Sequence, residues 1–371
     1  LKKIVLERCF RREPTNLYLP WGQTLASCFP CLECLFLTNV RVGFFDKSGL
    51  LKQNDTKLPE NLRELILDTV STTDRTYYSF EFPETIKSLA ITDCPNLVLK
   101  SMPETLKVCS FSSPKHLTPT LPELVELSIS CCSALKATKI VKPGDQYIPR
   151  SIQVLELTNV HWRNIASSSK SRTKFRDFWN HIDLPNLRVF RSDDCPLVDF
   201  VVPKSVLDVC FSFPEITRNI TCGSKVQIIS IIEAKSLKNL VIQESRHGSS
   251  VGSSNVVESN AMSNSTASAS SSSQSGDIAL RHLRITNAEK LATPDALAFC
   301  NQLQMIHLDN VDFSSLYYLP PSLRFMKILR CPSLTRLVVP KSCEVVQLMS
   351  LNSLNELRFD GSSSLKLSLI V

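Results

Sequence analysis

The sequence lacks the segments and motifs that would place it in a membrane or assign it a known catalytic chemistry. No run of eighteen apolar residues occurs in its 371 residues, so we expect no membrane span and no membrane partner. The first residues, LKKIVLERCFRRE, have no apolar core of the kind found in signal peptides. There is no His-Glu-x-x-His motif, no phosphate-binding Gly-Lys-Ser/Thr loop and no pair of carboxylates that can be placed on one face. We therefore expect neither an enzyme nor a bound cofactor.

Two short motifs match reactive or metal-binding sites in spacing alone. Cys28, Cys31 and Cys34 have the spacing of half a zinc or iron-sulfur site, but no complementary pair of Cys or His lies nearby in the sequence. The segment GSSVG at 248–252 matches Gly-x-Ser-x-Gly, but it lies in a serine-rich tract and not between a strand and a helix. We expect neither a metal centre nor a nucleophile from them.

The dominant feature is a short phrase with apolar residues at its first, fourth and sixth positions, as in Leu62-x-x-Leu65-x-Leu67. The clearest copies end in Cys-Pro, at 86–95 and 323–332. Fourteen copies start at Leu1, Leu32, Leu62, Ile86, Leu106, Leu124, Ile152, Leu187, Val206, Val226, Leu280, Leu303, Leu323 and Cys343. Seven of the thirteen spacings lie between 18 and 23 residues. Such a period predicts one elongated array, because each repeat buries its apolar face only against its neighbours.

Within each phrase the apolar period is two, which is typical of a strand with one buried face. Stacked side by side, the copies predict a parallel sheet of about fourteen strands. A proline precedes many of them by two or three residues, as Pro59 and Pro83 do, where it fixes an extended chain without disturbing the ladder. The repeats are too short for long helices, so we expect mostly extended or 3₁₀ segments on the other side.

The phrase Pro-x-x-Leu-x-x-Leu-x-Leu-x-x-Cys-Pro-x-Leu, near 83–97 and 320–334, resembles leucine-rich repeats, and the resemblance extends over essentially the whole chain. It implies an α/β-type solenoid, the leucine-rich repeat horseshoe, with a concave parallel sheet. A closing Cys in place of the usual Asn is similar to the repeats of F-box proteins, and the serine-rich tract is eukaryotic in style, as in fungal proteins. The short units that follow a proline also resemble arrays of bacterial effectors.

Five cysteines occupy the closing position of the phrase: Cys9, Cys94, Cys132, Cys195 and Cys331. We expect buried, reduced thiols there, and hence a cytoplasmic or nuclear protein. Where other repeats have Asn, its amide satisfies backbone groups of the turn. With a small apolar residue instead, the turn must satisfy those groups in another way.

Insertions divide the array. Residues 1–243 hold repeats one to ten, and residues 279–371 hold the last four and the beginning of a further strand in SLKLSLIV. Residues 163–182 carry five Lys or Arg against one Asp; they form either a short helix on the flank of the sheet or a basic patch for an acidic partner. The serine-rich residues 244–278 are expected to be disordered. Because the chain begins within a repeat and ends within a strand, we expect a fragment.

The alternation also assigns side chains to the exposed face of the sheet. In the first two thirds this face is mostly acidic, with Glu64, Asp68, Glu126, Glu156, Asp193 and Asp208. In the last third it holds Asp309 and seven residues that we expect to bind a partner: His282, Arg284, Met305, His307, Phe325, Lys327 and Met349. At a strand spacing of ~4.8 Å these form one patch, with the composition enriched at interface cores. The alternative is that they face only water or a capping segment.

Two functional hypotheses follow. The first is a non-enzymatic scaffold that binds a protein partner on its concave face. The second, implied by the resemblance to F-box proteins, is the substrate-recognition subunit of a cullin-RING ubiquitin ligase, whose adaptor would bind a segment before Leu1. Nucleic acid is not an expected partner under either hypothesis.

Overall fold

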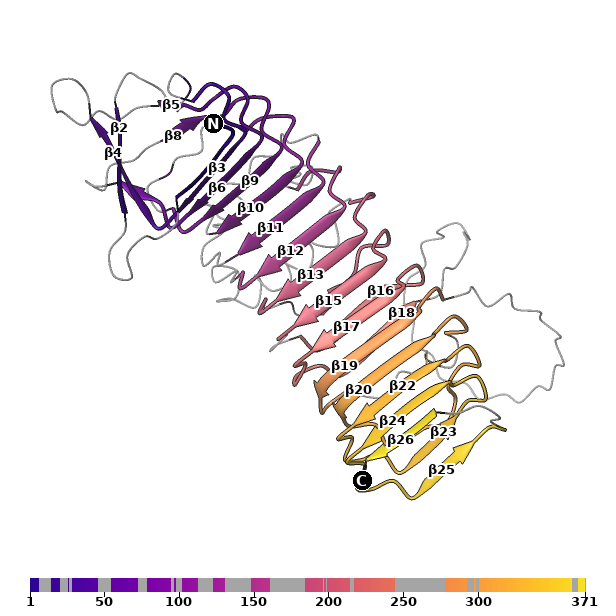
Figure 1. Cartoon of the computed structure of the whole chain (residues 1–371). Helices are drawn as coiled ribbons and strands as arrows, with labels where there is room; N and C mark the ends of the chain where they lie inside the picture. The colour runs from indigo at the N-terminus through magenta and orange to yellow at the C-terminus, as the bar shows by residue number, and fades with distance from the viewer. Residues whose placement is uncertain are drawn as a thin grey trace, which may run out of the picture.

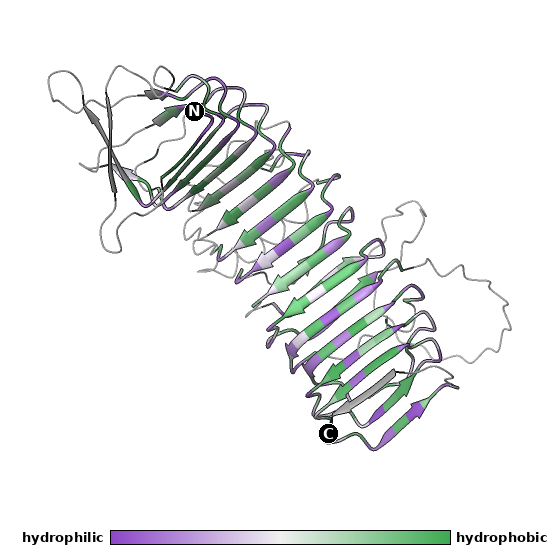
Figure 2. Cartoon of the chain, viewed as in Figure 1, coloured by the Kyte–Doolittle hydropathy of each residue, from purple (hydrophilic) through white to green (hydrophobic). Residues whose placement is uncertain are grey.

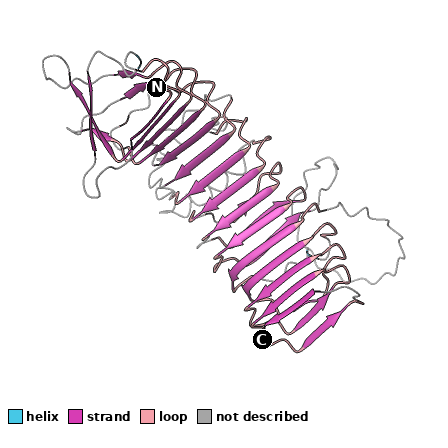
Figure 3. Cartoon of the chain, viewed as in Figure 1, coloured by secondary structure: helices cyan, strands magenta, loops and turns pink. Residues whose placement is uncertain are grey.

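The computed structural model consists of parallel strands joined by turns along one elongated array, with the two termini at opposite ends (Figure 1). The residues that it describes are 1–6, 15–20, 26, 29–45, 55–72, 79–94, 97, 102–112, 123–130, 148–160, 184–195, 197, 199–213, 217–243, 278–291, 297, 300–361 and 366–370. Strands and loops make up nearly all of this part (Figure 3). Within it, no helix has the length and apolar character needed to cross a membrane.

One large sheet runs the length of the molecule, and its strands follow one another in chain order. Its fifteen strands are β1 (Lys3–Leu6), β3 (Cys34–Thr38), β6 (Glu64–Asp68), β9 (Ser88–Thr92), β10 (Val108–Ser112), β11 (Glu126–Ser130), β12 (Val154–Thr158), β13 (Val189–Asp193), β15 (Asp208–Ser212), β17 (Ile228–Ile232), β19 (His282–Ala288), β20 (Met305–Val311), β22 (Phe325–Leu329), β24 (Val345–Met349) and β26 (Lys366–Ile370). The first fourteen lie on the fourteen predicted phrases, which confirms the predicted sheet. The fifteenth, β26, pairs with β24 at the place where a further strand was predicted to begin.

Where the structure describes it, the opposite side of the repeats is mostly extended, as predicted. Short parallel strands form three small three-stranded sheets and one two-stranded sheet there. These strands are β2 (Thr15–Pro20), β4 (Val40–Phe45) and β7 (Ser71–Thr72); β14 (Phe200–Val201), β16 (Asn219–Gly223) and β18 (Asn239–Gln243); β21 (Ser315–Leu316), β23 (Arg336–Val339) and β25 (Glu356–Phe359); and β5 (Asp55–Lys57) with β8 (Ser79–Glu81). We name this side the convex side and the open face of the large sheet the concave face.

The core lies between the two sides. Along β6, β9 and β12 buried and half-buried residues alternate, and the buried ones are the apolar residues of the phrase (Figure 2). In the middle of the array an aromatic cluster joins the two sides. The ring of Phe190 on β13 stacks on that of Phe200 on β14 with centroids 5.0 Å apart, and Phe211 on β15 contacts both, at 5.9 and 5.7 Å. All three side chains are buried.

A tight turn leads into most of the described strands. The first residue of the phrase donates its N–H to the carbonyl three residues earlier, which often belongs to proline: Leu62 to Pro59 at 3.0 Å and Ile86 to Pro83 at 3.2 Å. Proline thus opens the turn, in addition to fixing the chain direction. The residue just before the phrase is often Ser or Thr, and its hydroxyl donates to a carbonyl of the preceding repeat, as in Ser151 to Leu124 at 2.7 Å. These side chains join consecutive repeats outside the strand ladder.

In the described repeats, the turn that leaves the strand has a left-handed residue at the eighth position of the phrase. In eleven repeats φ at this position lies between 46° and 58°, at Asn39, Thr69, Asp93, Asn159, Asp194, Phe213, Glu233, Asn287, Asn310, Arg330 and Ser350. Its N–H often bonds the next strand, as in Asn39 to the carbonyl of Asp68 at 2.8 Å. These recurring strands and turns identify the fold as a leucine-rich repeat solenoid.

Phe213 is the bulkiest of these left-handed residues, and its side chain is 52% exposed. A left-handed conformation costs most residues roughly 1–2 kcal/mol, whereas Asn tolerates it. We therefore expect Phe213→Asn to raise the free energy of unfolding by about 1 kcal/mol, measured by urea denaturation. Phe213→Ala, which removes the ring and keeps the unfavourable Cβ, should give no gain; an equal gain in both variants would contradict the backbone origin of the effect.

Candidate functional site

Four neighbouring strands near the C-terminal end, β19, β20, β22 and β24, carry all seven predicted partner-binding residues on the concave face. The strand register places His282, Met305 and Phe325 in one row across the strands. Arg284, His307 and Lys327 form the next row. Met349 of β24 lies in a third row opposite Leu329. The structure therefore brings the seven residues together as predicted, while their role in binding stays a prediction.

The first row contains a pair of exposed apolar side chains. Met305 is 40% exposed and Phe325 is 42% exposed, and the two are partners in the register of adjacent strands. Among the described residues of the concave face, the other exposed large apolar side chains, Val5 and Val108, lie on strands far from this pair and from each other. Met305 and Phe325 thus form a local apolar contact surface, which we name the apolar pair.

The second row, Arg284, His307 and Lys327, is named the basic row. The His307 imidazole sits between the two cations, one on each neighbouring strand, and its Nε2 atom is buried without a hydrogen-bond partner. Burial, together with the charges of Lys327 and Arg284, lowers the pKa of His307 below its ordinary value of 6.5. Neither Arg284 nor Lys327 has an ion-pair partner among the described residues. The row is therefore a concentration of positive charge that no nearby carboxylate neutralises.

Asp309 was predicted to be an exposed member of the same face, but its carboxylate is bound by Arg330. The guanidinium donates two hydrogen bonds, at 2.8 and 2.6 Å, and the Asp309 side chain is only 14% exposed. This bidentate contact raises the pKa of Arg330. Arg330 lies just beyond β22, at the left-handed turn position. The pair ties β20 to the end of β22 at the edge of the patch.

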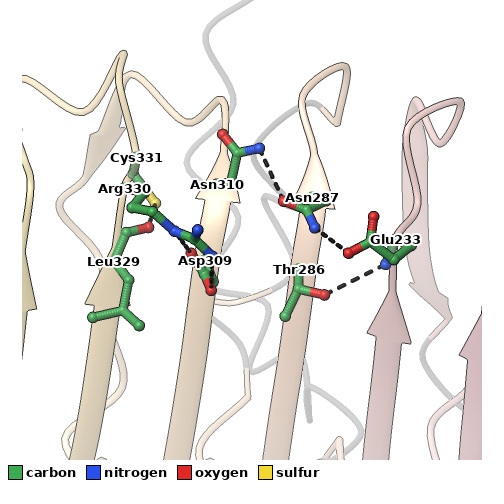
Figure 4. A network of polar contacts seen from close by, with 8 residues as sticks. All are labelled: Glu233, Thr286, Asn287, Asp309, Asn310, Leu329, Arg330 and Cys331. Atoms are coloured by element: carbon green, nitrogen blue, oxygen red, sulfur yellow. Dashed lines mark hydrogen bonds and ion pairs between the residues drawn. The ribbon is translucent and has the colours of Figure 1, made fainter.

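A polar network continues along this edge to β17 (Figure 4). The amide of Asn310 donates to Asn287 Oδ1 at 2.9 Å, and the amide of Asn287 donates to Glu233 Oε1. The Glu233 N–H also approaches Thr286 Oγ1 at 3.4 Å. Because Glu233 and Asn287 flank the long insertion, the network joins repeats that are 54 residues apart in the sequence. The patch thus rests on a continuous sheet despite the insertion.

The first two thirds of the concave face carry the predicted acidic residues, and part of their charge is already paired. Arg191 of β13 donates to Glu156 of β12 at 2.6 Å, which raises the pKa of the guanidinium. The pKa of Asp208 is raised, chiefly by burial, although Arg191 acts in the opposite direction. The face therefore changes from acidic to basic along the array.

The described closing cysteines lie where the phrase predicts. Their thiols contact backbone carbonyl oxygens of the turn, which carries no Asn at this position. The Cys195 thiol is 3.4 Å from the carbonyl oxygen of Leu157 in the preceding repeat and 3.3 Å from that of Asp193. Cys94 makes the same two kinds of contact, and the Cys331 thiol lies 3.3 Å from the carbonyl oxygen of Leu329. Burial raises the pKa of Cys331 to about 11, so its thiol keeps the proton that it donates. Cys9 and Cys132 lie outside the described residues.

Other predicted features are placed only in part. Cys31 is exposed and Cys34 half-buried, and both are free thiols, while Cys28 lies outside the described residues. In the described part of the chain, no group of three His, Cys, Asp or Glu side chains is arranged to hold a metal ion. The basic segment 163–182 and nearly all of 244–278 also lie outside that part. The structure therefore does not test the predictions made for these two segments.

Sequence reasoning missed the residues that hold the edge of the patch. Arg330, Asn287 and Asn310 all occupy the eighth position of the phrase, one residue before the closing position. The frequent Asn and Asp at this position were a signal for a left-handed turn. The ion pair between Arg330 and Asp309 had no such signal, because it joins residues 21 apart across two repeats.

Among known proteins, the chain shows similarity only to solved structures. No model of a protein family matches the sequence, and no curated protein matches it. The chain is similar to YopM from Yersinia enterocolitica WA-314, with 15% identity, 93% of this chain and 78% of that chain covered and a TM-score of 0.33. It is also similar to TLR13 in a complex with ssRNA13, with 14% identity, coverage of 93% and 60% and a TM-score of 0.33. A third likeness is to the plant peptide hormone receptor RGFR1 in complex with RGF2, with 14% identity, coverage of 97% and 75% and a TM-score of 0.26.

Proposed function

We propose that this chain is a non-enzymatic scaffold that binds a protein partner on its concave face, centred on the patch of His282, Arg284, Met305, His307, Phe325, Lys327 and Met349. The observation that carries the proposal is the apolar pair lying directly beside the basic row. Exposed apolar side chains that adjoin on a surface indicate an interaction site. Aromatic residues, Met and Arg are enriched in the cores of protein interfaces.

The difference between the two faces of these strands supports the proposal. The four strands of the patch bury their inward side chains almost completely, as Leu283, Ile306 and Met326 show. The outward side chains of the same strands have no second layer among the described residues. A partner that covers Met305 and Phe325 would remove apolar surface from water, which stabilises a complex by about 25 cal/mol per Å² of apolar surface before the costs of association.

The test is to combine Phe325→Ala with His307→Ala in the chain and to measure its affinity for the protein that co-purifies with it from its own cells. We expect at least a tenfold loss of affinity, because central aromatic residues carry much of the binding energy in interfaces. Thermal unfolding should change little, since both side chains lie outside the core. Tyr318→Ala is the matched control, because Tyr318 is 80% exposed and follows β21 on the convex side. Unchanged affinity in the double variant would remove the patch from consideration.

The compartment and the ubiquitin-ligase hypothesis are further parts of this proposal. A cytoplasmic or nuclear location is supported by the ten described cysteines, all of which are free thiols. The alternative role as the substrate-recognition subunit of a cullin-RING ligase stays a prediction from the resemblance. Co-purification with a cullin and its adaptor is the observation that would favour it.

A further inference from the structure

We propose that the basic row recognises an acidic side chain, Asp or Glu, in an extended segment of the partner, and that an apolar residue two positions away in that segment packs on Met305 and Phe325. This inference deepens the proposed function and depends on it. It names what the partner presents to the patch. Its three supports are the charge of the row, the half-buried imidazole and the spacing between the rows.

The charge of the row is the first support. Arg284 and Lys327 flank His307 on adjacent strands, so each lies about 4.8 Å from it in the direction across the sheet. Elsewhere on the same face the arginines near carboxylates are already paired, as Arg191 is with Glu156. Arg284 and Lys327 keep their charges free of such a partner among the described residues. A carboxylate placed over His307 would contact both cations.

The imidazole is the second support. The His307 ring is half-buried between two positive side chains, with its Nε2 atom closed to solvent. A carboxylate above the sheet would accept a hydrogen bond from the other nitrogen of the protonated ring, Nδ1. The same contact would offset the repulsion that now opposes protonation.

The spacing of the rows is the third support. Met305 and His307 are two residues apart on β20, as Phe325 and Lys327 are on β22. Side chains two residues apart on one face of a strand are separated by about 6.6–6.8 Å. A partner segment that lies extended along these strands presents its own alternate side chains with the same spacing. One of its apolar residues then meets the apolar pair while its acidic residue meets the basic row.

The third row limits where along the strands an acidic residue of the partner can lie. Beyond His307 on β20 lies Asp309, with Arg330 bound to it, and beyond Lys327 on β22 lies Leu329. The Asp309 carboxylate disfavours a second acidic residue at that place. The segment is therefore one acidic residue with an apolar neighbour two positions away on the side of Met305.

Binding should take up a proton. The charged groups that face His307 are Arg284 from β19, Lys327 from β22 and Asp309 on its own strand. In the free chain the pKa of His307 is lowered, and a bound carboxylate would raise it. Protonation is therefore more favourable in the complex, so affinity should increase as the pH falls through the pKa of the bound state and level off below that of the free state.

The experiment uses the full chain and two synthetic peptides, acetyl-Phe-Ser-Glu-Ser-amide and the same peptide with Gln in place of Glu. Binding is measured by calorimetry, and the pKa of His307 is followed by its imidazole NMR signals. We expect the Glu peptide to bind at least tenfold more tightly than the Gln peptide and to raise the pKa of His307. In the variant with Arg284→Gln and Lys327→Gln the two peptides should bind equally.

Equal binding of the two peptides to the unchanged chain would overturn the recognition of an acidic group. Two other results would overturn it as well: tighter binding of an eight-nucleotide oligothymidylate than of the Glu peptide, or dimerisation of the chain that is lost in the Arg284→Gln and Lys327→Gln variant. Failure of the proposed function is distinguishable from these results. If the partner loses affinity when Phe325 and His307 are replaced but not when Arg284 and Lys327 are, the concave face remains the binding surface and the acidic recognition alone is wrong.

Discussion

Replacing Phe190 with alanine is expected to lower the free energy of unfolding by about 3–5 kcal/mol, the range found for large aromatic residues removed from a core. The Phe190 ring is fully buried and contacts both Phe200 and Phe211, so its loss opens a cavity between the concave and convex sides. The expected measurement is urea denaturation followed by circular dichroism.

Phe190 lies in the middle of the array, so its replacement should also change the shape of the unfolding transition. In a solenoid each repeat is stabilised by its own contacts and by its two neighbours. A defect in the middle of the array should therefore separate the unfolding of the segments before and after β13, which hydrogen exchange along the chain would resolve. Phe213→Ala is the matched control, because that ring is exposed and its loss should change stability little. A loss below about 1 kcal/mol in Phe190→Ala would contradict the cluster as a joint between the two sides.

Asn287→Ala is expected to cost about 2–4 kcal/mol, the second largest effect. Asn287 has a φ of 50°, a conformation that alanine adopts at a cost of roughly 1–2 kcal/mol. Its amide also accepts a hydrogen bond from Asn310 and donates one to the carboxylate of Glu233. Hydrogen bonds to charged groups contribute about 1.5–3 kcal/mol each.

A comparison of two variants separates these causes. Asn287→Gly keeps the left-handed backbone and removes only the amide, so it should cost less than Asn287→Ala, and the difference measures the backbone contribution. Hydrogen exchange should become faster in β17 and β19, the strands of the large sheet that precede and follow the long insertion. Unchanged exchange there, together with unchanged stability, would show that the strand ladder alone holds the two parts of the array together.

Much of the fold followed from the phrase itself. A residue such as Leu65 or Leu67 must be buried if its neighbours in the phrase alternate with it, so the strands and the face of each side chain could be predicted. The same alternation placed His282, Arg284 and Phe325 on one surface. The spacing within one phrase was sufficient there, because equivalent positions of successive phrases lie side by side in the parallel sheet.

Only some of the left-handed turn positions could be predicted from the sequence. Asn and Asp fill six of the eleven positions with positive φ and could have indicated them. Phe213, Glu233 and Arg330 do not share that preference. At Phe213 and Arg330 the conformation is accompanied by the hydrogen bond from the N–H to the following repeat, which is a tertiary contact. Sequence patterns report intrinsic preference and cannot report such a contact.

The chemistry of the patch depended on contacts between repeats. Asp309 belongs to the exposed face by alternation, yet Arg330 of the next repeat covers it. The His307 ring has the same exposed assignment, but neighbours on both sides bury its Nε2 atom. In each case the contact joins side chains of neighbouring repeats, and the alternation within one phrase does not report it. The composition of the patch could therefore be predicted, and its pattern of charge could not.

The strands of the large sheet lie across the long axis of the molecule, and the two termini lie at opposite ends (Figure 1). The hydrogen bonds between neighbouring strands consequently run along that axis. A pulling force applied between the termini would load these bonds along their own direction, one interface after another, and would not shear many of them at once. We therefore expect repeats to unfold one at a time at low force when the chain is pulled by its ends. A partner bound across several strands should raise the force needed to unfold the segment that it covers.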